Sequence, residues 1–425
     1  MIGFLEIANM QDENIKTKTP DAHRKTRKEP FVRIVKRSDI QRAKAWMIRV
    51  GAIILAMCVG GIIVLLMGHN PFAVYSAMFT GSFATATSRS ETIKTAVPLL
   101  GAAIAIAPSF RMRFWNIGAE GQILVGAVAA TYFALYVKTM PSVMLLLAMM
   151  LAAMVAGGIW GLIPGFFKAK WGTNETLFTL MLNYIALELT KYFQHGPWRN
   201  PMSGGFPKIA MFDNAARLPK LGIAGIFDVH IGWIFVLVLA VLMLIYLRHT
   251  KQGYEIAVVG ESERTARYAS MNVGKIIMRT VFISGAIAGL VGFLLVSGAN
   301  GTLSDSTAGG VGFTAISVAW LAKLNPIVMI FIALFIAVLS KGSNTIQTNF
   351  KIPASAADVL TGIILFFMLG CEFFINYKLI FRGVPSAEST PPDSTAPSPE
   401  VTAPDSAAPS PEVTAPDGAV GEEAE

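Results

Sequence analysis

Residues 52–67 read AIILAMCVGGIIVLLM, and this uncharged apolar run decides the class of fold. With its flanks, it is long enough to cross a hydrocarbon core of about 30 Å. Similar runs recur along the chain, whose residues are 53% hydrophobic and 15% charged. Soluble domains carry about 25% charged residues. The excess apolar surface needs lipid as its solvent, so the sequence predicts an integral membrane protein.

The apolar runs predict an all-α fold, a polytopic transmembrane helical bundle of about ten spans with re-entrant or broken segments. The expected spans are residues 46–68, 92–110, 117–137, 142–166, 176–194, 231–248, 278–299, 311–322, 325–341 and 356–378. The eighth is short and follows a glycine-rich stretch, so either a full crossing or a broken, re-entrant helix fits it. Residues 70–83 are too short to span and are expected to lie along the outer surface.

Two polar ends flank the expected transmembrane domain, which covers residues 46–380. Residues 1–45 form a basic arm, which we expect to lie in the cytoplasm near anionic lipid. Residues 386–425 form an acidic, proline-rich tail, in which PDSTAPSPEVTA at 392–403 recurs as PDSAAPSPEVTA at 404–415. Such a repeat buries too little apolar surface to offset its ordering entropy, so we expect it to be disordered.

The net charge of +8 is compatible with nucleic-acid binding, but its distribution argues against that function. Residues 1–49 hold 12 Lys and Arg against 6 Asp and Glu, and most other basic residues lie in short connections. Loops rich in Lys and Arg stay in the cytoplasm. The pattern therefore predicts cytoplasmic N- and C-termini, an external connection at 195–230 and no nucleic-acid partner.

No motif in the sequence indicates an enzyme or a resident cofactor. A phosphate-binding loop, a His-Glu-x-x-His zinc pair and a Gly-x-Ser-x-Gly nucleophile turn are all missing. Cys58 and Cys371 lie in apolar runs without metal-ligand spacing, so no metal site is expected. If ATP drives this protein, we expect ATP and Mg²⁺ to be bound by a partner ATPase subunit.

The first polar motif is Asn116-Ile117-Gly118-Ala119-Glu120-Gly121-Gln122, which opens an expected span at its cytoplasmic end. Asn116 can cap this span. Glu120 is costly at the membrane boundary unless it is paired or hydrated. One interpretation is a packing turn whose Glu120 pairs with Arg111 or Arg113. The other is that Asn116, Glu120 and Gln122 contribute to a solute path.

The second motif runs from Thr173-Asn174-Glu175 to Asn183-Tyr184. Thr173 or Asn174 is a good N-cap, and Glu175 in the first turn complements the helix dipole. Asn183 and Tyr184 lie two turns into the span, where polar groups usually face a neighbouring helix or a cavity. Hydrogen bonding between helices and contact with a solute are both open.

The third motif lies in the long basic connection 248–279. After Gly260 we expect a short amphipathic helix, capped near Glu261 or Ser262, that runs to about Met271. Such a helix could seat in a groove of a motor subunit, with contacts from Gly260, Glu261, Arg264, Arg267 and Tyr268. A solvated surface helix would give the same pattern.

Taken together, the three motifs resemble the permeases of bacterial ATP-binding-cassette importers for simple sugars, nucleosides and branched-chain amino acids. The stretches ISGAIAGL at 283–290 and GFTAI at 312–316 extend the resemblance over roughly residues 50–380. The Glu-Gly-Gln ending and the Met-Leu-Asn-Tyr segment at 181–184 are most similar to the larger permease of nucleoside importers, which pair with a binding protein of the basic membrane protein type.

The resemblance implies a multi-pass subunit of the bacterial plasma membrane that carries a nucleoside or a related polar solute inward without an ATPase site of its own. The implied partners are ATP-binding-cassette ATPase subunits, a second homologous permease and an extracellular solute-binding lipoprotein. Two alternatives remain open. One is a permease for ribose- or galactose-type sugars, and the other is an ion-coupled carrier that would use mid-span carboxylates such as Glu188 and Glu372.

Overall fold

The computed structural model of the chain describes residues 32–36, 42–222 and 227–381. The acidic tail at 386–425 and most of the basic arm at 1–45 lie outside the described residues. The chain divides into two units, one formed by Lys36–Lys378 and one formed by Met1–Val35 with Leu379–Glu425. The short strands β1 (Val32–Lys36) and β2 (Tyr377–Phe381) pair with each other in a two-stranded sheet.

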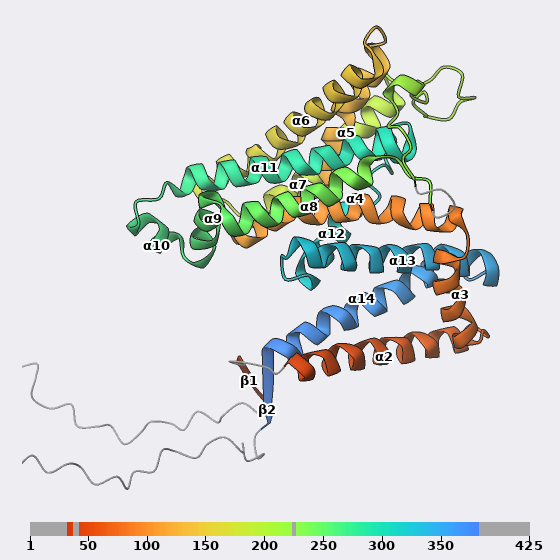
Figure 1. Cartoon of the computed structure of the whole chain (residues 1–425), viewed down its shortest axis with the longest axis vertical. Coiled ribbons are helices and arrows are strands. Elements are labelled where there is room, and N and C mark those ends of the chain that lie inside the picture. The colour runs from red at the N-terminus through yellow and green to blue at the C-terminus, as the bar shows by residue number, and fades with distance from the viewer. Residues whose placement is uncertain (1–31, 37–41, 223–226, 382–425) are drawn as a thin grey trace, which may run out of the picture. The chain divides into compact units, whose positions relative to one another are not determined.

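The unit Lys36–Lys378 is built from helices, and each of the expected spans is one of them (Figure 1). The prediction of an all-α polytopic bundle is therefore confirmed. In chain order the elements are α2 (Arg42–Leu66), α3 (Pro71–Phe83), α4 (Ala86–Arg111), α5 (Ala119–Tyr136), α6 (Ser142–Trp171), α7 (Glu175–His195), the short η1 (Asn214–Ala216), α8 (Gly232–His249), α9 (Lys251–Glu261), α10 (Glu263–Tyr268), α11 (Val273–Phe293), the π-helical η2 (Leu294–Asn300), α12 (Val311–Leu321), α13 (Pro326–Phe350) and α14 (Ala354–Asn376).

In the described part of the chain, 7 helices are long and apolar enough to cross a membrane, so the protein is a multi-pass membrane protein. They are α2, α4, α6, α8, α11 with η2, α13 and α14. The other three expected spans differ for physical reasons. Helix α12 has only 11 residues, whereas α5 and α7 carry charged side chains such as Glu120 and Glu188.

Helices α4 and α11 form the centre of the bundle. In the most apolar 18-residue segment of each helix, 78% of the residues of α4 and 83% of those of α11 with η2 are buried. The corresponding share is between 22% and 28% in α2, α6, α8 and α14. Small residues allow the central helices to approach closely. A Cβ added at Gly289 of α11 would overlap the carbonyl oxygen of Ala153 in α6, and one at Gly292 would overlap that of Ile123 in α5.

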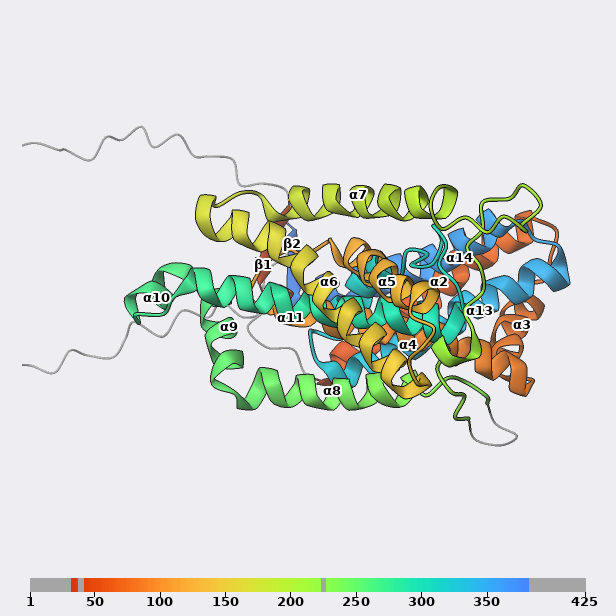
Figure 2. The same cartoon turned by 90° about the horizontal axis from the view of Figure 1, so that it is seen from above.

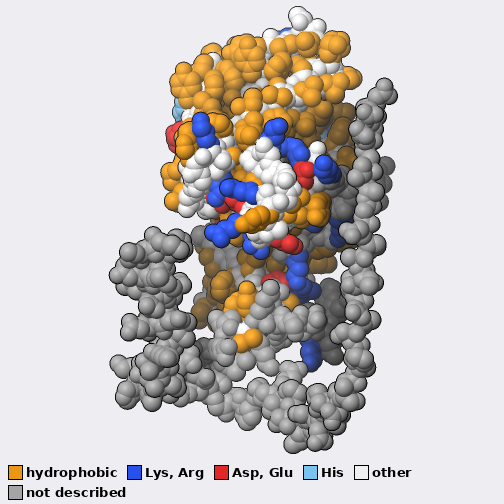
Figure 3. Space-filling model, turned by 90° about the vertical axis from the view of Figure 1, so that its left-hand side faces the viewer, with side chains coloured by type: hydrophobic (Ala, Val, Ile, Leu, Met, Phe, Trp, Pro, Cys, Tyr) orange, Lys and Arg blue, Asp and Glu red, His pale blue; other side chains and the backbone are white. Residues whose placement is uncertain are grey.

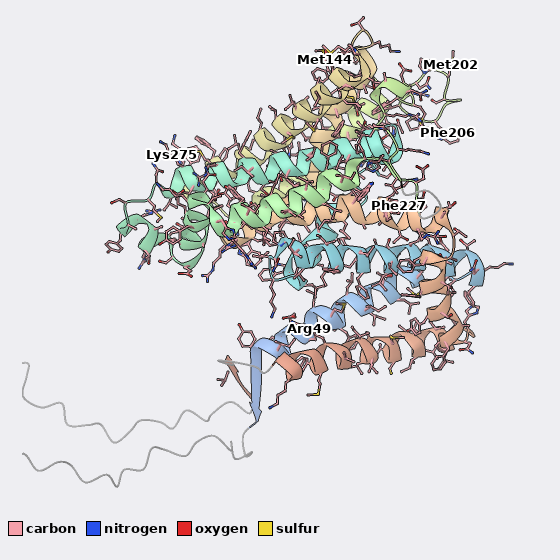
Figure 4. The ribbon with its side chains drawn as sticks, viewed as in Figure 1. Arg49, Met144, Met202, Phe206, Phe227 and Lys275 are labelled. Carbon is pink, nitrogen blue, oxygen red and sulfur yellow. The ribbon has the colours of Figure 1, made fainter. Side chains whose placement is uncertain are left out.

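The helical unit has two distinct ends. Helices α9 and α10 and the start of α11, with Lys275, lie at one of them, which we call the α10 end (Figures 2 and 4). Met144 at the start of α6 and the connection with Met202 and Phe206 lie at the opposite end, which we call the loop end (Figure 4). Lys and Arg side chains gather over the α10 end between hydrophobic surfaces (Figure 3).

At the loop end, His230 lies buried just before α8, with 2% of its surface exposed. Its Nδ1 accepts a hydrogen bond from the Gly232 backbone N–H at 3.2 Å. Gly232 and Gly298 flank the ring, and a Cβ at either glycine would lie 2.6 Å from Nδ1. Desolvation, with a smaller contribution from the charge of Lys94, lowers the pKa of His230 from 6.5 to about 4. The imidazole is therefore neutral at physiological pH.

Candidate functional site

The motif at 116–122 forms a buried polar cluster at the start of α5. Asn116 and Gln122 exchange two side-chain hydrogen bonds of 3.2 Å, and the Asn116 amide also donates to Ser284 Oγ of α11 at 3.2 Å. Asn116 Oδ1 accepts from the Gly118 backbone N–H at 3.1 Å. Asn116 thus closes the turn that precedes the helix, and the N-cap residue is Gly118, not Asn116 as we expected.

Asn183 of α7 joins this cluster from the side. Its Oδ1 accepts from the Gly121 N–H at 2.8 Å, and its Nδ2 donates to the Ile117 carbonyl at 2.9 Å. The expected hydrogen bonding between helices is therefore present. Tyr184 does not join the cluster, because it lies on the other face of α7 with 60% of its surface exposed.

Glu120 is held by the backbone at the start of α12. Its Oε1 accepts from the Gly310 N–H and its Oε2 from the Gly312 N–H, each at 2.7 Å. The expected pairing with Arg111 or Arg113 is wrong. The first amides of a helix lack partners within the helix and carry its positive dipole end, so they stabilise a carboxylate as a basic side chain would.

The cluster lies deep between the helices, not at the membrane boundary as its sequence position suggested. Along the axis of α7, Asn183 lies about 12 Å from the first residue, Glu175, since a helix rises about 1.5 Å per residue. Ser284 follows the first residue of α11, Val273, by about 16 Å on the same measure. Both helices start at the α10 end, so α5 begins about a third of the way across the bundle from that end, and residues 112–118 re-enter the bundle.

Helix α12 also begins inside the bundle. It has 11 residues, which span about 16 Å, and it begins beside Glu120. Its other end lies near the end of α4, because Trp320 stacks on Trp115 with ring centroids 5.5 Å apart. Of the two alternatives for residues 311–322, a full crossing or a broken helix, the structure has the broken helix. Helices α5 and α12 therefore start at the same depth, and Glu120 in the first turn of α5 joins them by its hydrogen bonds to the start of α12.

At the start of α7, the expected cap is present. Asn174 Oδ1 accepts from the backbone N–H groups of Thr176 and Leu177 at 3.1 and 3.2 Å. Glu175 pairs with Lys168 of α6 at 2.8 Å, so the ends of α6 and α7 are tied at the α10 end.

The basic connection 248–279 contains two helices where we expected one after Gly260. Gly260 and Glu261 end α9, and Ser262 separates α9 from α10. The Ser262 hydroxyl accepts a hydrogen bond from the Thr265 backbone N–H of α10 at 3.2 Å. Helix α10 ends at Tyr268, not near Met271, and the next residues lead into α11. The break arises because Ser262 is extended and caps the second helix instead of continuing the first.

The exposed face of α10 is charged. Arg264 and Arg267 are exposed, Arg267 lies 3.8 Å from Glu263, and Tyr268 is 91% exposed. On the inner side, α9 packs on the end of α4, because a Cβ at Gly260 would overlap the Arg111 carbonyl oxygen. Of the residues expected to contact a motor, Gly260 is thus an internal packing position, whereas Glu261, Arg264, Arg267 and Tyr268 face outward.

The two carboxylates expected at mid-span differ in their surroundings, and Glu372 lies only four residues before the end of α14. Glu372 is 16% exposed and pairs with Arg49 at 2.8 Å and Lys323 at 3.1 Å, so it links α2 and the turn after α12 to α14. Glu188 pairs with Lys191 at 2.7 Å within α7, but its side chain is 68% exposed.

The sequence did not identify the partners of the cluster. Ser284 lies in a stretch rich in small residues, and its polarity inside an apolar span was the available signal. Gly310 and Gly312 contribute only backbone N–H groups, which no side-chain pattern reveals. The positive φ of Gly310, 81°, explains why glycine is needed there.

Comparison with known proteins places this arrangement in a family. Residues 88–369 match the family described as branched-chain amino acid transport system, permease component. The glucose ABC transporter permease protein TsgB13 of Haloferax volcanii is 33% identical over 81% of this chain and 92% of its own. The guanosine ABC transporter permease protein NupP of Bacillus subtilis is 32% identical over 77% of this chain and 94% of its own. The nucleoside ABC transporter permease protein NupB of Lactococcus lactis is 31% identical over 80% of this chain and 94% of its own. The chain belongs to this family of permease components of ABC transporters.

Proposed function

We propose that the chain is the larger permease of an ATP-driven importer for nucleosides. The observation that carries this proposal is the similarity to NupP and NupB, two permeases named for guanosine and nucleosides, over more than three quarters of the chain. The proposed partners are two ATP-binding-cassette ATPase subunits, a second homologous permease and an extracellular solute-binding lipoprotein. ATP and Mg²⁺ would bind to the ATPase partner.

The proposed orientation has the α10 end in the cytoplasm of a bacterial cell, and we propose the same compartment for both termini. The basic residues Arg111, Arg113, Lys168, Lys170 and Arg248 support it, since they follow or end helices at that end. The connection 196–231 would then face the binding protein outside.

The proposed coupling runs from the ATPase through α10 to the polar cluster. The exposed Arg264, Arg267 and Tyr268 would seat in a groove of the ATPase. Movement of α10 would reach α4 through the close contact between Gly260 and Arg111. From Arg111 the chain leads directly into the re-entrant segment and to Glu120, which holds the start of α12. Discontinuous helices that meet inside the membrane are typical of transporters.

The test is uptake by cells that express the chain with its ATPase, second permease and binding protein. We expect saturable uptake of labelled guanosine that requires all four components and stops when the ATPase is inactivated. Uptake that persists with an inactive ATPase and follows a proton or sodium gradient would support the ion-coupled alternative instead.

A sugar is the second candidate solute, because TsgB13, which is named for glucose, is 33% identical to this chain. Competition decides between the two. If the complex takes up labelled glucose or ribose and excess unlabelled guanosine does not compete with that uptake, the solute is a sugar.

A further inference from the structure

One face of α7 carries exposed polar groups on the opposite side from Asn183. Tyr184 and Tyr192 are 60% and 64% exposed, and the side chains of Glu188 and Lys191 are 68% and 37% exposed. The spacing 184, 188, 191 and 192 places these residues on one stripe of a helix. We call this stripe the outer face of α7.

Tyr184 and Glu188 of the outer face lie well inside the helical bundle, whereas Lys191 and Tyr192 lie in the last turn of α7, which ends at His195. Gly121 of α5 and Asn183 of α7 are hydrogen-bonded and therefore level, and α5 and α7 both run from there toward the loop end (Figure 2). Glu188 is thus level with Gly126, and α5 continues for about 15 Å beyond that residue to Tyr136.

Helix α6 gives the same depth independently. A Cβ at Gly161 would lie 3.2 Å from Gln122 Nε2, so Gly161 is level with the polar cluster. Helix α6 begins at Ser142, about 28 Å from Gly161 toward the loop end. Glu188 lies about 7.5 Å from the cluster in that direction, five residues beyond Asn183. It therefore lies about 20 Å inside the start of α6, level with Val155.

The two helices differ in exposed charge at this depth: α7 exposes Glu188 beside the apolar Ile185, which is 54% exposed, whereas α6 exposes apolar side chains. Val155 and Ile159 of α6 are 50% and 53% exposed, and α6 has no charged residue before Lys168. That face is suited to lipid. A charged side chain that faces hydrocarbon inside a span is unfavourable. The contact between Glu188 and Lys191 offsets part of this cost, but the carboxylate is still mostly uncovered. The outer face of α7 therefore needs water beside it.

The side chains on this face also suit a polyhydroxylated solute. A carboxylate accepts hydrogen bonds from neighbouring hydroxyl groups, and Lys191 can donate to ring or carbonyl oxygens. Tyr184 and Tyr192 offer aromatic surfaces with a polar tip, on which a base or a sugar ring can lie.

We propose that the outer face of α7, formed by Tyr184, Glu188, Lys191 and Tyr192, lines the water-filled path and that Glu188 binds hydroxyl groups of the passing solute. This proposal rests on the proposed function, because it assigns the contact residues of the same transporter. The polar cluster around Glu120 then lies behind α7 and supports the path without forming its wall.

Water access tests the proposal without any need for transport. In a background with Cys58→Ala and Cys371→Ala, single cysteines replace Tyr184, Glu188, Ile159 or Val155 in the complete transporter. The assay follows their reaction with a cationic, membrane-impermeant methanethiosulfonate in permeabilised vesicles. A thiol reacts as the thiolate, which forms only where water reaches it. Position 184 of α7 lies at about the depth of position 159 of α6, and position 188 at about the depth of position 155. The two cysteines of each pair therefore differ in the helix face that carries them and not in depth.

We expect labelling at 184 and 188 to be at least tenfold faster than at 159 and 155, and to slow when guanosine or glucose is added in excess. Equal rates on both helices would mean that lipid or a second permease covers α7, and would overturn the proposal.

Uptake provides the second measurement. Glu188→Gln should be inserted at normal abundance, since the side chain is exposed, but should raise the KM for solute at least fivefold. An unchanged KM would also overturn the proposal. If the wild-type complex carries neither nucleosides nor sugars, the proposed function fails, and the labelling contrast still reports independently on whether α7 borders water.

Discussion

Replacement of Glu120 by Gln tests whether the carboxylate holds the start of α12. In the wild type, each carboxylate oxygen accepts one backbone N–H, from Gly310 and from Gly312, at 2.7 Å. Gln keeps one acceptor oxygen but presents an NH₂ group to the other N–H, so one of the two bonds is lost. The remaining bond also loses its ionic character.

The magnitude follows from these two contacts. A hydrogen bond to a charged group contributes about 1.5–3 kcal/mol. The loss of one bond therefore predicts a destabilisation of about 2 kcal/mol or more, close to a 30-fold change in the folded-to-unfolded ratio. Glu120→Ala should cost more, because it leaves both N–H groups unpaired in the protein interior.

The assay is thermal unfolding of the detergent-solubilised protein together with its abundance in the membrane. Glu91→Gln is the matched control, because Glu91 is 44% exposed, and surface substitutions usually change stability by less than about 0.5 kcal/mol. If Glu120→Gln matches the wild type in thermal stability and abundance but abolishes uptake, the carboxylate acts on the solute, and the structural reasoning is refuted.

Three further predictions concern other parts of the molecule. Reversal of charge at Arg264 and Arg267 should lower uptake and transport-coupled ATP hydrolysis at least tenfold at normal abundance, and unchanged coupling would exclude docking through α10. Because burial lowers the pKa of His230 to about 4, the unfolded chain binds a proton between pH 6.5 and 4 that the folded chain does not. The contribution of His230 to the free energy of unfolding should therefore be complete above pH 6.5, and about 3 kcal/mol of it should be lost as the pH drops to 4. The loss should be smaller in His230→Gln. If the free energy of unfolding falls equally with pH in the wild type and in His230→Gln, His230 is not its origin. Gly289→Val should lower stability by about 1–3 kcal/mol or more, since it overfills the contact with α6, whereas Gly370→Val in α14, with open space around it, should not.

The positions of the helices follow from the sequence because lipid imposes a simple constraint. Each expected span is a helix in the structure, since backbone groups in a membrane must be satisfied within a segment. The Asn174 cap was also predictable, because a cap depends on residues only two or three positions away. The three motifs that carry the resemblance likewise indicate the family from the sequence by itself.

The depth of the polar cluster and the partners of Glu120 were decided only by the tertiary structure. In sequence, Glu120 follows Arg111 and Arg113 closely, which suggested an ion pair at the membrane boundary. In the fold, residues 112–118 re-enter the bundle and bring Glu120 to backbone amides almost two hundred positions away. Those amides belong to glycines and carry no side-chain signature. The outer face of α7 was hidden for a related reason, because periodicity indicates that a helix has two faces but only packing decides which of them is buried.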